Sequence, residues 1–276
     1  MASLLNEIEA QVASKGASLI YARTHDSQEI EQNKLKELRQ LGVKGIVIYP
    51  VDGESYNEEI LRLHLADFPM VVIDRYLRGI ETNCVYSDNL FGGYQATSHL
   101  LKLGHREIGF VSTISGGTTS IEDRLAGYEK ASTEAGVQMR TDHRLFTRKT
   151  LDEDNRQVIK EYLQGHSELT AIVAVNSTLG LQVVETAEEL GLSIPRDLSV
   201  VFFDPSERLS FTPTHVQQQA GDTAREAIRL LYEAIADPKC KRMRVELPTR
   251  LVEGVSSAPP RQSGALVHDE SADGSG

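Results

Sequence analysis

Four polar side chains lie where parallel α/β proteins bind ligands, just past the carboxyl ends of predicted strands or early in the following helix. They are Asp88, Arg124, Asn176 and Asp204. One guanidinium, two carboxylates and an amide supply the planar, bidentate hydrogen bonds that recognise vicinal hydroxyl groups. The set therefore points to a site for a small polyhydroxylated molecule.

Each of these residues also has a purely structural explanation. Asp88 and Asn176 are good N-cap residues, and Asp204 followed by Pro205 is common turn chemistry. Only the combination of side chains favours a binding site over ordinary capping.

Motifs for other chemistry are missing from the sequence. It contains no G-x-x-x-x-G-K-[ST] phosphate loop, no G-x-G-x-x-G motif after a strand and no G-x-S-x-G elbow. His99 and His105 are the closest histidines, but Gly104 ends the helix between them, so we expect no metal site. The run 115–120 (SGGTTS) has two interpretations, an anion cradle ahead of the helix carrying Arg124 or an N-capping loop, and the second is favoured. We expect neither an enzyme nor a cofactor.

The elements that must position these residues alternate along the chain. Near-continuous apolar runs predict strands at Lys44–Tyr49, Met70–Asp74 and Ala171–Val175, among others, and a further strand is predicted at Ser18–Ala22. Helical apolar spacing separates them, and a helix ending in Leu-Gly recurs before three of the strands. This alternation predicts an α/β fold with parallel sheets covered on both faces.

Composition excludes several classes of protein. The 276 residues suffice for one large or two ordinary domains, and they carry 29 Lys and Arg against 40 Asp and Glu, a net charge of −11. Such a chain is not expected to bind DNA unaided at physiological salt, because nonspecific affinity comes from Lys and Arg displacing counterions. Two cysteines are too few for a disulfide framework. No apolar run approaches the ~18 residues of a membrane span, and no signal peptide is visible, so we expect a cytoplasmic protein.

Several longer runs form one composite pattern over roughly residues 3–257, in unbroken order. They are VVIDR (71–75), VYSDNLFGGYQATSHLLKLGHREIGFVS (85–112), EDRLAGYEKASTEAG (122–136), TAIVAVNSTLGLQVVETAEELGLSIPRDLSVVFFD (170–204), FTPTHVQQ (211–218) and LPTRLVEGVSS (247–257). Together these runs resemble the effector-binding domain of the lactose/galactose-repressor family of transcriptional regulators.

The resemblance implies a periplasmic-binding-protein-like fold of type I, with two Rossmann-like subdomains joined by three crossover segments. The crossovers are expected near Ser112–Ser115, Gln217–Asp222 and Leu247–Thr249. The N-terminal subdomain then comprises residues 1–113 and 219–247, and the C-terminal subdomain residues 114–218 and 248–257. Residues 258–276 are rich in Pro, Gly, Ser and Asp and are expected to form a flexible tail.

The resemblance also implies roles for single residues. Arg124 matches the arginine that holds the effector, and Asp204 matches its acidic partner. Asn176, Asp88 and Gln218 match positions that face the cleft. The implied function is a small-molecule sensor, for a sugar or polyol, that acts as a homodimer and reaches DNA only through a domain not present in this sequence.

Other functions remain open at this point. A solute-binding protein of a sugar transporter shares the fold, and an enzyme would use Asp88 or Asp204 as a general base. The DNA-binding partner domain could be a helix-turn-helix or a winged helix, as in arabinose repressors.

One departure from the family concerns the first strand. Family members begin the effector domain with a strand, whereas this sequence begins at the helix after it. We expect a gap in the sheet between Ser18–Ala22 and Lys44–Tyr49. Either the natural start lies upstream, or Ala265–His268 supplies a substitute strand.

Overall fold

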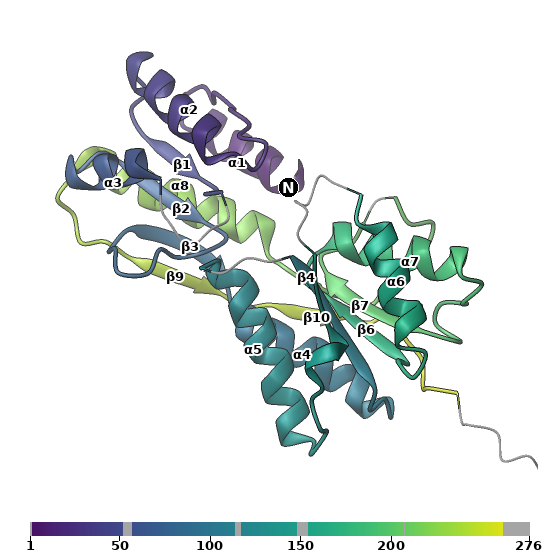
Figure 1. Cartoon of the computed structure of the whole chain (residues 1–276). Helices are drawn as coiled ribbons and strands as arrows, with labels where there is room; N and C mark the ends of the chain where they lie inside the picture. Colours follow the sequence, from purple (N-terminus) through teal and green to yellow (C-terminus); the bar gives the residue numbers. More distant parts are fainter. Residues whose placement is uncertain (1, 52–56, 114–116, 148–153, 207, 262–276) are drawn as a thin grey trace, which may run out of the picture.

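The computed structural model describes residues 2–51, 57–113, 117–147, 154–206 and 208–261 (Figure 1). It contains two β-sheets with helices packed against them, and each sheet with its helices is called a half below. The strands are parallel except that β10 runs antiparallel to β8. The α/β architecture expected from the alternation of strands and helices is therefore confirmed.

The first half is built on a four-stranded sheet. In spatial order its strands are β1 (Ile46–Ile48), β2 (Met70–Ile73), β3 (Asn83–Ser87) and β9 (Arg244–Leu247). Its helices are α1 (Ala2–Ser14), α2 (Gln28–Gln40), α3 (Glu58–Leu65) and α8 (Ala220–Ala236).

The second half is built on a six-stranded sheet. In spatial order its strands are β10 (Arg250–Val252), β8 (His215–Gln217), β7 (Ser199–Phe203), β6 (Ala171–Ala174), β4 (Ile108–Thr113) and β5 (Arg144–Thr147). Its helices are α4 (Asn89–Lys102), α5 (Thr119–Glu134), α6 (Arg156–Gly165) and α7 (Ser177–Glu189), with a 3₁₀ turn at Thr141–His143.

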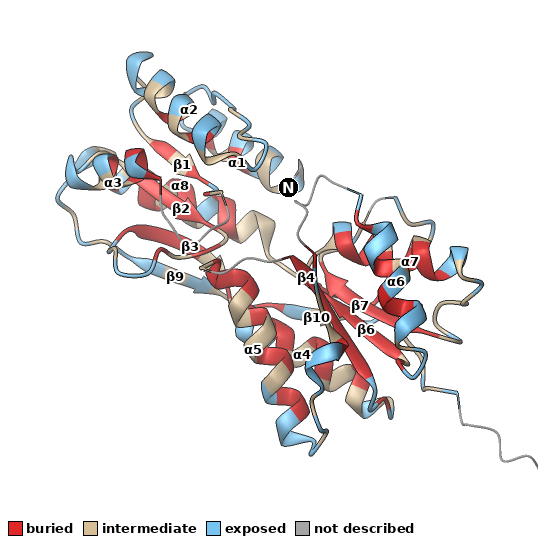
Figure 2. Ribbon diagram, viewed as in Figure 1, coloured by how far each residue is buried: buried red, intermediate tan, exposed pale blue. Residues whose placement is uncertain are grey.

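The central strands of both sheets are buried on two faces, which explains their continuous apolar runs, whereas the edge strands β9 and β10 are partly exposed (Figure 2). In β2, Val71 and Ile73 pack in one cluster with α1 and α8. Met70 and Val72 pack in another cluster with α2 and α3. Successive side chains of a strand point to opposite faces, so this short strand contributes to two cores.

Three connections join the halves. They run from β3 to α4 at Ser87–Asn89, from β8 to α8 at Gln217–Ala220, and from β9 to β10 at Leu247–Arg250. The first and third lie side by side, because the N–H of Asp88 donates to the carbonyl of Leu247 at 2.8 Å. The second and third connections agree with the expected crossovers.

The expected first crossover at Ser112–Ser115, and with it the subdomain boundary at residue 113, is wrong. β4 pairs with β5 and β6 in the six-stranded sheet, and α4 packs on α5 and on strands of that sheet. The chain therefore passes to the second half at Ser87–Asn89, before α4. A buried strand flanked by helices has the same apolar pattern in either sheet, so hydropathy could not assign β4.

The predicted strand at Ser18–Ala22 is also wrong. This segment forms no strand, and Leu19, Ile20 and Tyr21 are 37, 52 and 56 % exposed. Among the described residues β1 pairs only with β2, so none of them bridges the expected gap beside Lys44–Tyr49. Ala265–His268 lies outside the described residues. A strand pattern without a neighbouring strand cannot form a ladder.

The start of the predicted flexible tail is bound to the second half. The carbonyl of Ala258 accepts hydrogen bonds from the His105 ring at 2.8 Å and from Ser199 at 3.1 Å. Arg261 pairs with Asp197 at 2.9 Å. The tail expected from residue 258 thus begins with two anchored residues, Ala258 and Arg261, and residues 262–276 lie outside the described part. In the described residues, no helix is long and apolar enough to cross a membrane.

Two glycines let α4 and α5 approach until their backbones touch. A Cβ on Gly127 would lie 2.1 Å from the carbonyl oxygen of Leu90, and one on Gly93 would lie 2.1 Å from that of Arg124. Real Cβ atoms do not approach backbone so closely, so any larger residue would separate the helices. This contact fixes the position of α5 and of Arg124 on it.

We therefore predict that Gly127→Ala lowers the free energy of unfolding by about 3 kcal/mol, because overpacking between two backbones cannot relax by rotating a side chain. Gly165→Ala, on an exposed helix end with open space around the Cβ, is the control and should change stability by less than ~1 kcal/mol. Urea denaturation measures both. Equal effects of the two substitutions would contradict the close contact of α4 and α5.

Candidate functional site

Arg124 lies at the centre of the residues that sequence analysis singled out. Its side chain, on α5, is buried, with a relative exposure of 5 %. Its guanidinium donates to Asn89 Oδ1 at 2.8 Å, to the carbonyl of Val175 at 2.5 Å and to Gln218 Oε1 at 3.2 Å. One face stacks on the ring of Phe203, 3.9 Å from its centroid. The group is thus held from several elements at once.

Gln218 connects Arg124 to Asp204. While its carbonyl oxygen accepts from Arg124, its Nε2 donates to Asp204 Oδ2 at 2.6 Å and its backbone N–H donates to Oδ1 at 3.0 Å. We call the chain Arg124–Gln218–Asp204 the Arg124 network. It brings together three of the five predicted site residues, and Gln218 itself lies in the connection from β8 to α8.

Two aspartates at strand ends have backbone conformations that few residues adopt. Asp204, after β7, has φ of 59°, and Asp74, after β2, has φ of 74°. Asp and Asn tolerate this left-handed region better than other non-glycine residues. Such strain is concentrated at functional sites in proteins, and the charges of both aspartates act on Arg124.

The charge of Arg124 is balanced by these same carboxylates. Burial lowers the pKa of the Arg124 guanidinium, and the negative charges of Asp74 and Asp204 oppose that shift. An arginine remains protonated in proteins, so the site holds a desolvated cation flanked by two anions. A ligand that replaces one of its hydrogen-bond partners must itself accept a hydrogen bond.

The first half contributes residues that the sequence analysis did not select as site residues. Asp74 Oδ2 accepts from Arg75 Nη2 at 3.1 Å and from Ser120 Oγ at 3.1 Å. The Arg75 guanidinium lies over the ring of Tyr49, 4.9 Å from its centroid. Asp74 ends the predicted strand Met70–Asp74, so the strand-end rule that selected Asp204 would have found it.

The segment 74–78 of the first half is bound to the first turn of α5. Besides the bond from Ser120 to Asp74, Thr119 Oγ1 donates to the carbonyl of Tyr76 at 3.1 Å and accepts from its N–H at 3.3 Å. Arg78 forms an ion pair with Glu122. We call these contacts the clasp. They hold the two halves together at the site.

The clasp also settles part of the interpretation of the 115–120 run. Ser115 and Gly116 lie outside the described residues, but the turn that begins α5 receives a carboxylate of the chain itself, Asp74, through Ser120. Glu122 accepts the N–H of Gly117 at 2.8 Å. The described part of this run therefore begins the helix and binds the segment 74–78, although the N-cap residue Thr118 makes no side-chain capping hydrogen bond.

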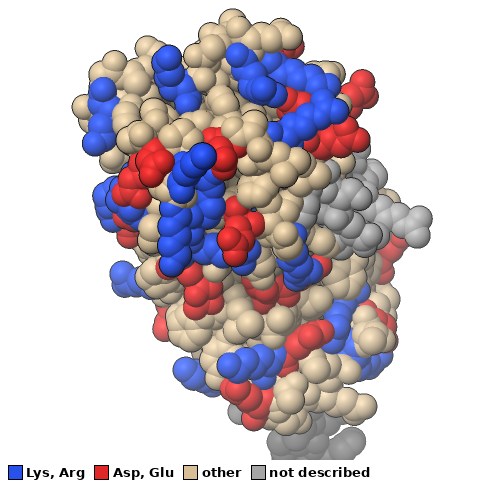
Figure 3. Space-filling model, turned by 90° about the vertical axis from the view of Figure 1, so that its left-hand side faces the viewer, with Lys and Arg blue, Asp and Glu red and all other residues tan. Residues whose placement is uncertain are grey.

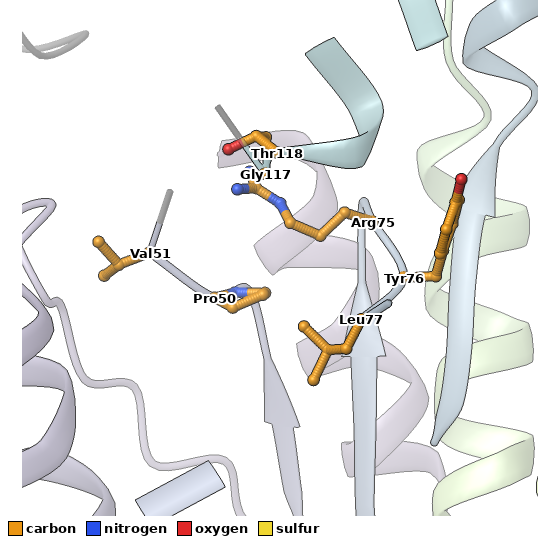
Figure 4. A pocket seen from close by; sticks show the side chains of 7 residues that line it. All are labelled: Pro50, Val51, Arg75, Tyr76, Leu77, Gly117 and Thr118. Atoms are coloured by element: carbon orange, nitrogen blue, oxygen red, sulfur yellow. The ribbon is translucent and has the colours of Figure 1, made fainter. Parts of the chain in front are cut away.

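A small cavity lies between the halves beside the clasp. Its volume is ≈ 10 Å³, and Pro50, Val51, Arg75, Tyr76, Leu77, Gly117 and Thr118 line it. Figure 4 shows the Arg75 side chain extending toward Gly117 and Thr118. This volume is close to the minimum for a single water molecule. This cavity is too small for a sugar, so a ligand that binds here must displace some of its lining side chains or separate the halves.

A wider hollow of ≈ 310 Å³ lies at the surface of the first half, lined by Lys36, Arg39, Gln40 and Glu59. These residues come from α2 and α3 only, and Arg39 already pairs with Glu59 at 2.9 Å. It includes none of the strand-end residues and is not the candidate site.

Asp88 and Asn176 act as helix caps in the structure. Asp88 Oδ1 accepts the N–H of Phe91 at 2.8 Å, and Asn176 Oδ1 accepts the N–H of Leu179 at 2.9 Å. Neither hydrogen-bonds to the Arg124 network within the described residues. The structure thus shows for both the structural role that the sequence left open, and a role in binding stays a prediction. No group of His, Cys, Asp or Glu in the described residues is arranged to hold a metal ion.

Comparison with known proteins identifies the family. Residues 97–257 match the periplasmic binding protein-like domain. The chain belongs to this family. It is 28 % identical over 254 residues to the HTH-type transcriptional repressor PurR of Mannheimia succiniciproducens. The aligned region covers 91 % of this chain and 75 % of that protein. It is 32 % identical over 207 residues to the arabinose metabolism transcriptional repressor of Geobacillus stearothermophilus, covering 71 % of this chain and 55 % of that repressor.

Solved structures agree with this assignment. A LacI family transcriptional regulator from Enterococcus faecium with bound ribose has a TM-score of 0.80 at 25 % identity, covering 94 % of both chains. The complex of the transcriptional regulator CelR with cellobiose has a TM-score of 0.81 at 25 % identity, covering 93 % of this chain and 78 % of that one. The chain thus corresponds to the effector-binding domain of LacI-family regulators, and the periplasmic-binding-protein-like fold expected from the resemblance is confirmed.

If the clasp holds the halves together, removing its hydrogen bonds should make the ligand-free chain less compact. Replacing Thr119 by Val and Ser120 by Ala removes three hydrogen bonds between the halves. Each contributes about 1 kcal/mol. We expect the double variant to have a larger radius of gyration in small-angle X-ray scattering.

The control for this experiment is Thr133→Val, which removes a hydroxyl that bonds within α5 to Glu129. It should leave the scattering curve unchanged. A clasp variant with the scattering curve of the unmodified chain would show that the clasp does not hold the halves together.

Proposed function

We propose that the chain is the small-molecule sensor of a LacI-family transcriptional regulator and that a sugar or related polyol binds between its halves. The observation that carries this proposal is the Arg124 network, in which a buried cation and a carboxylate are bridged by one carboxamide. The carboxamide of Gln218 accepts from Arg124 and donates to Asp204, which is the pair of hydrogen bonds that two vicinal hydroxyl groups make.

The relatives support a polyol as the ligand class. Structures of similar regulators carry ribose and cellobiose, and both curated relatives described above are transcriptional repressors. These findings favour a regulator over a transporter protein or an enzyme. A regulator of this kind acts in the cytoplasm, where its target DNA lies.

The proposed mechanism begins at Gln218. Incoming hydroxyl groups take over its hydrogen bonds to Arg124 and Asp204, and Asp74 and Arg75 contribute further partners from the first half. Because Gln218 lies in a connection between the halves, its displacement changes how the halves pack. Binding thereby shifts a two-state equilibrium that a DNA-binding domain can report.

A thermal-shift screen of pentoses, hexoses, polyols and purines tests the ligand class, since a ligand that binds only the native state raises its stability. With the sugar that gives the largest shift, Arg124→Met should weaken binding by about 2–4 kcal/mol in calorimetry, because it removes charged donors from a desolvated site. Arg140→Met removes an exposed arginine of the second half and should leave affinity unchanged. Unchanged affinity of Arg124→Met would reject its role.

The same proposal includes a homodimer, the arrangement in which the resemblance implies that such sensors act. Light scattering at micromolar concentration should give about twice the chain mass of 30.5 kDa. Particles of the chain mass alone would contradict it.

A further inference from the structure

Four lysines gather at the end of the first half opposite the Arg124 network. The amino ends of the parallel strands lie there, whereas the strand-end aspartates lie at the carboxyl ends. Lys44 precedes β1, and Lys239 and Lys241 lie between α8 and β9. Lys15 follows α1, with its ammonium 5.8 Å from the ring centroid of Tyr232 on α8. All four are exposed, and we call them the outer lysines.

The outer lysines have no carboxylate partners in the part of the chain that the structure describes. Most arginines of the chain pair with a carboxylate, such as Arg62 with Glu58 and Arg229 with Glu233. No such pair within 4.0 Å includes an outer lysine among the described residues. Their positive charge is therefore available to an external anion.

Most nearby acidic residues are already engaged with other groups. Asp67 pairs with Arg242 at 2.9 Å, and Asp237 accepts the backbone N–H of Lys239 at 3.0 Å. Glu37 and Glu233, in the last turns of α2 and α8, pair with Lys34 and Arg229, and Glu81 precedes β3. The outer lysines are therefore uncompensated positive charges on a chain whose net charge is −11. Figure 3, which views this side of the molecule, shows Lys and Arg side chains spread over it with Asp and Glu side chains between them.

Helix capping explains only part of this arrangement. Lys15 and Lys239 follow the ends of α1 and α8, where a cation complements the helix dipole. Lys44 and Lys241 precede strands and gain nothing from a dipole. The four charges extend from β1 to β9, the two edges of the sheet, which is three strand spacings or about 14 Å. That extent suits an extended polyanion better than a single small ion.

We propose that the outer lysines contact the phosphate backbone of duplex DNA. The choice of DNA rests on the proposed function, since a transcriptional regulator acts on DNA. Duplex DNA presents one charge per ~1.7 Å of axis, so several phosphates lie within reach of this surface. The contact is independent of base sequence, and it lies at the end away from the effector site, where a ligand between the halves does not cover it.

The test is fluorescence anisotropy of a labelled duplex of arbitrary sequence, titrated with the full chain at several salt concentrations. We expect weak binding at low salt, with the logarithm of the association constant falling against that of salt with a slope of about −3 to −4. At physiological salt the net charge of the chain should make binding negligible. Lys239→Glu with Lys241→Glu should weaken low-salt binding at least tenfold and reduce the slope by about 2.

The matched control is Lys102→Glu with Lys130→Glu, two exposed lysines on α4 and α5 of the second half. This pair changes net charge by the same amount and should leave binding nearly unchanged. Equal losses in the two double variants, or no binding at low salt, would overturn the proposal. Equal affinity for poly-glutamate and for the duplex would also overturn it, in favour of an acidic protein partner.

Thermal shift with the polyol panel separates this proposal from the proposed function. The double variant Lys239→Glu with Lys241→Glu should keep the thermal shift of the unmodified chain, because the substitutions lie away from the effector site. Polyol binding without DNA binding would reject the DNA contact alone. DNA binding without any polyol shift would reject the sensor and leave the contact standing.

Discussion

Burial of the Arg124 guanidinium is the constraint on which the rest of the site depends. A desolvated cation is costly unless hydrogen-bond acceptors and opposite charges surround it. Here the acceptors come from Asn89, Val175 and Gln218, and the opposing carboxylates from Asp74 and Asp204. Asp74 belongs to the first half, and Gln218 lies in a connection between the halves. One side chain thus makes the electrostatics of the site depend on how the two halves are arranged, as a sensor requires.

The fold satisfies this constraint through backbone contacts. Gly93 and Gly127 allow α4 and α5 to touch, and that contact sets where the first turn of α5 meets the segment 74–78. The carboxyl ends of the parallel strands then bring Asp74 and Asp204 to the same region from two different sheets. Packing in each half can be satisfied independently, so the polar contacts between the halves are the part of the structure that a ligand can exchange for its own.

The sequence could predict the features that follow from local patterns, which are the fold class and the residues at strand ends. Strand–helix alternation indicated the α/β fold, and the strand-end rule with the family resemblance selected Arg124, Asp204 and Gln218, which the structure joins in one network. It could not assign β4 and α4 to the second half, because a buried strand has the same apolar pattern in either sheet. The prediction of a strand at Ser18–Ala22 was wrong for a related reason, since a β pattern does not show whether a neighbouring strand is present to pair with it. Asp74 was missed although the same strand-end rule applied to it.

We propose that Arg124 and Asp204 recognise one ligand jointly. A calorimetric double-mutant cycle with Arg124→Met and Asp204→Asn, using the polyol that stabilises the chain most, measures this directly. Both residues hydrogen-bond Gln218 and are predicted to bind neighbouring hydroxyl groups of one ligand. Their losses of binding free energy should therefore be non-additive by at least ~1 kcal/mol. Additive losses, or a screen in which no polyol binds, would contradict the account.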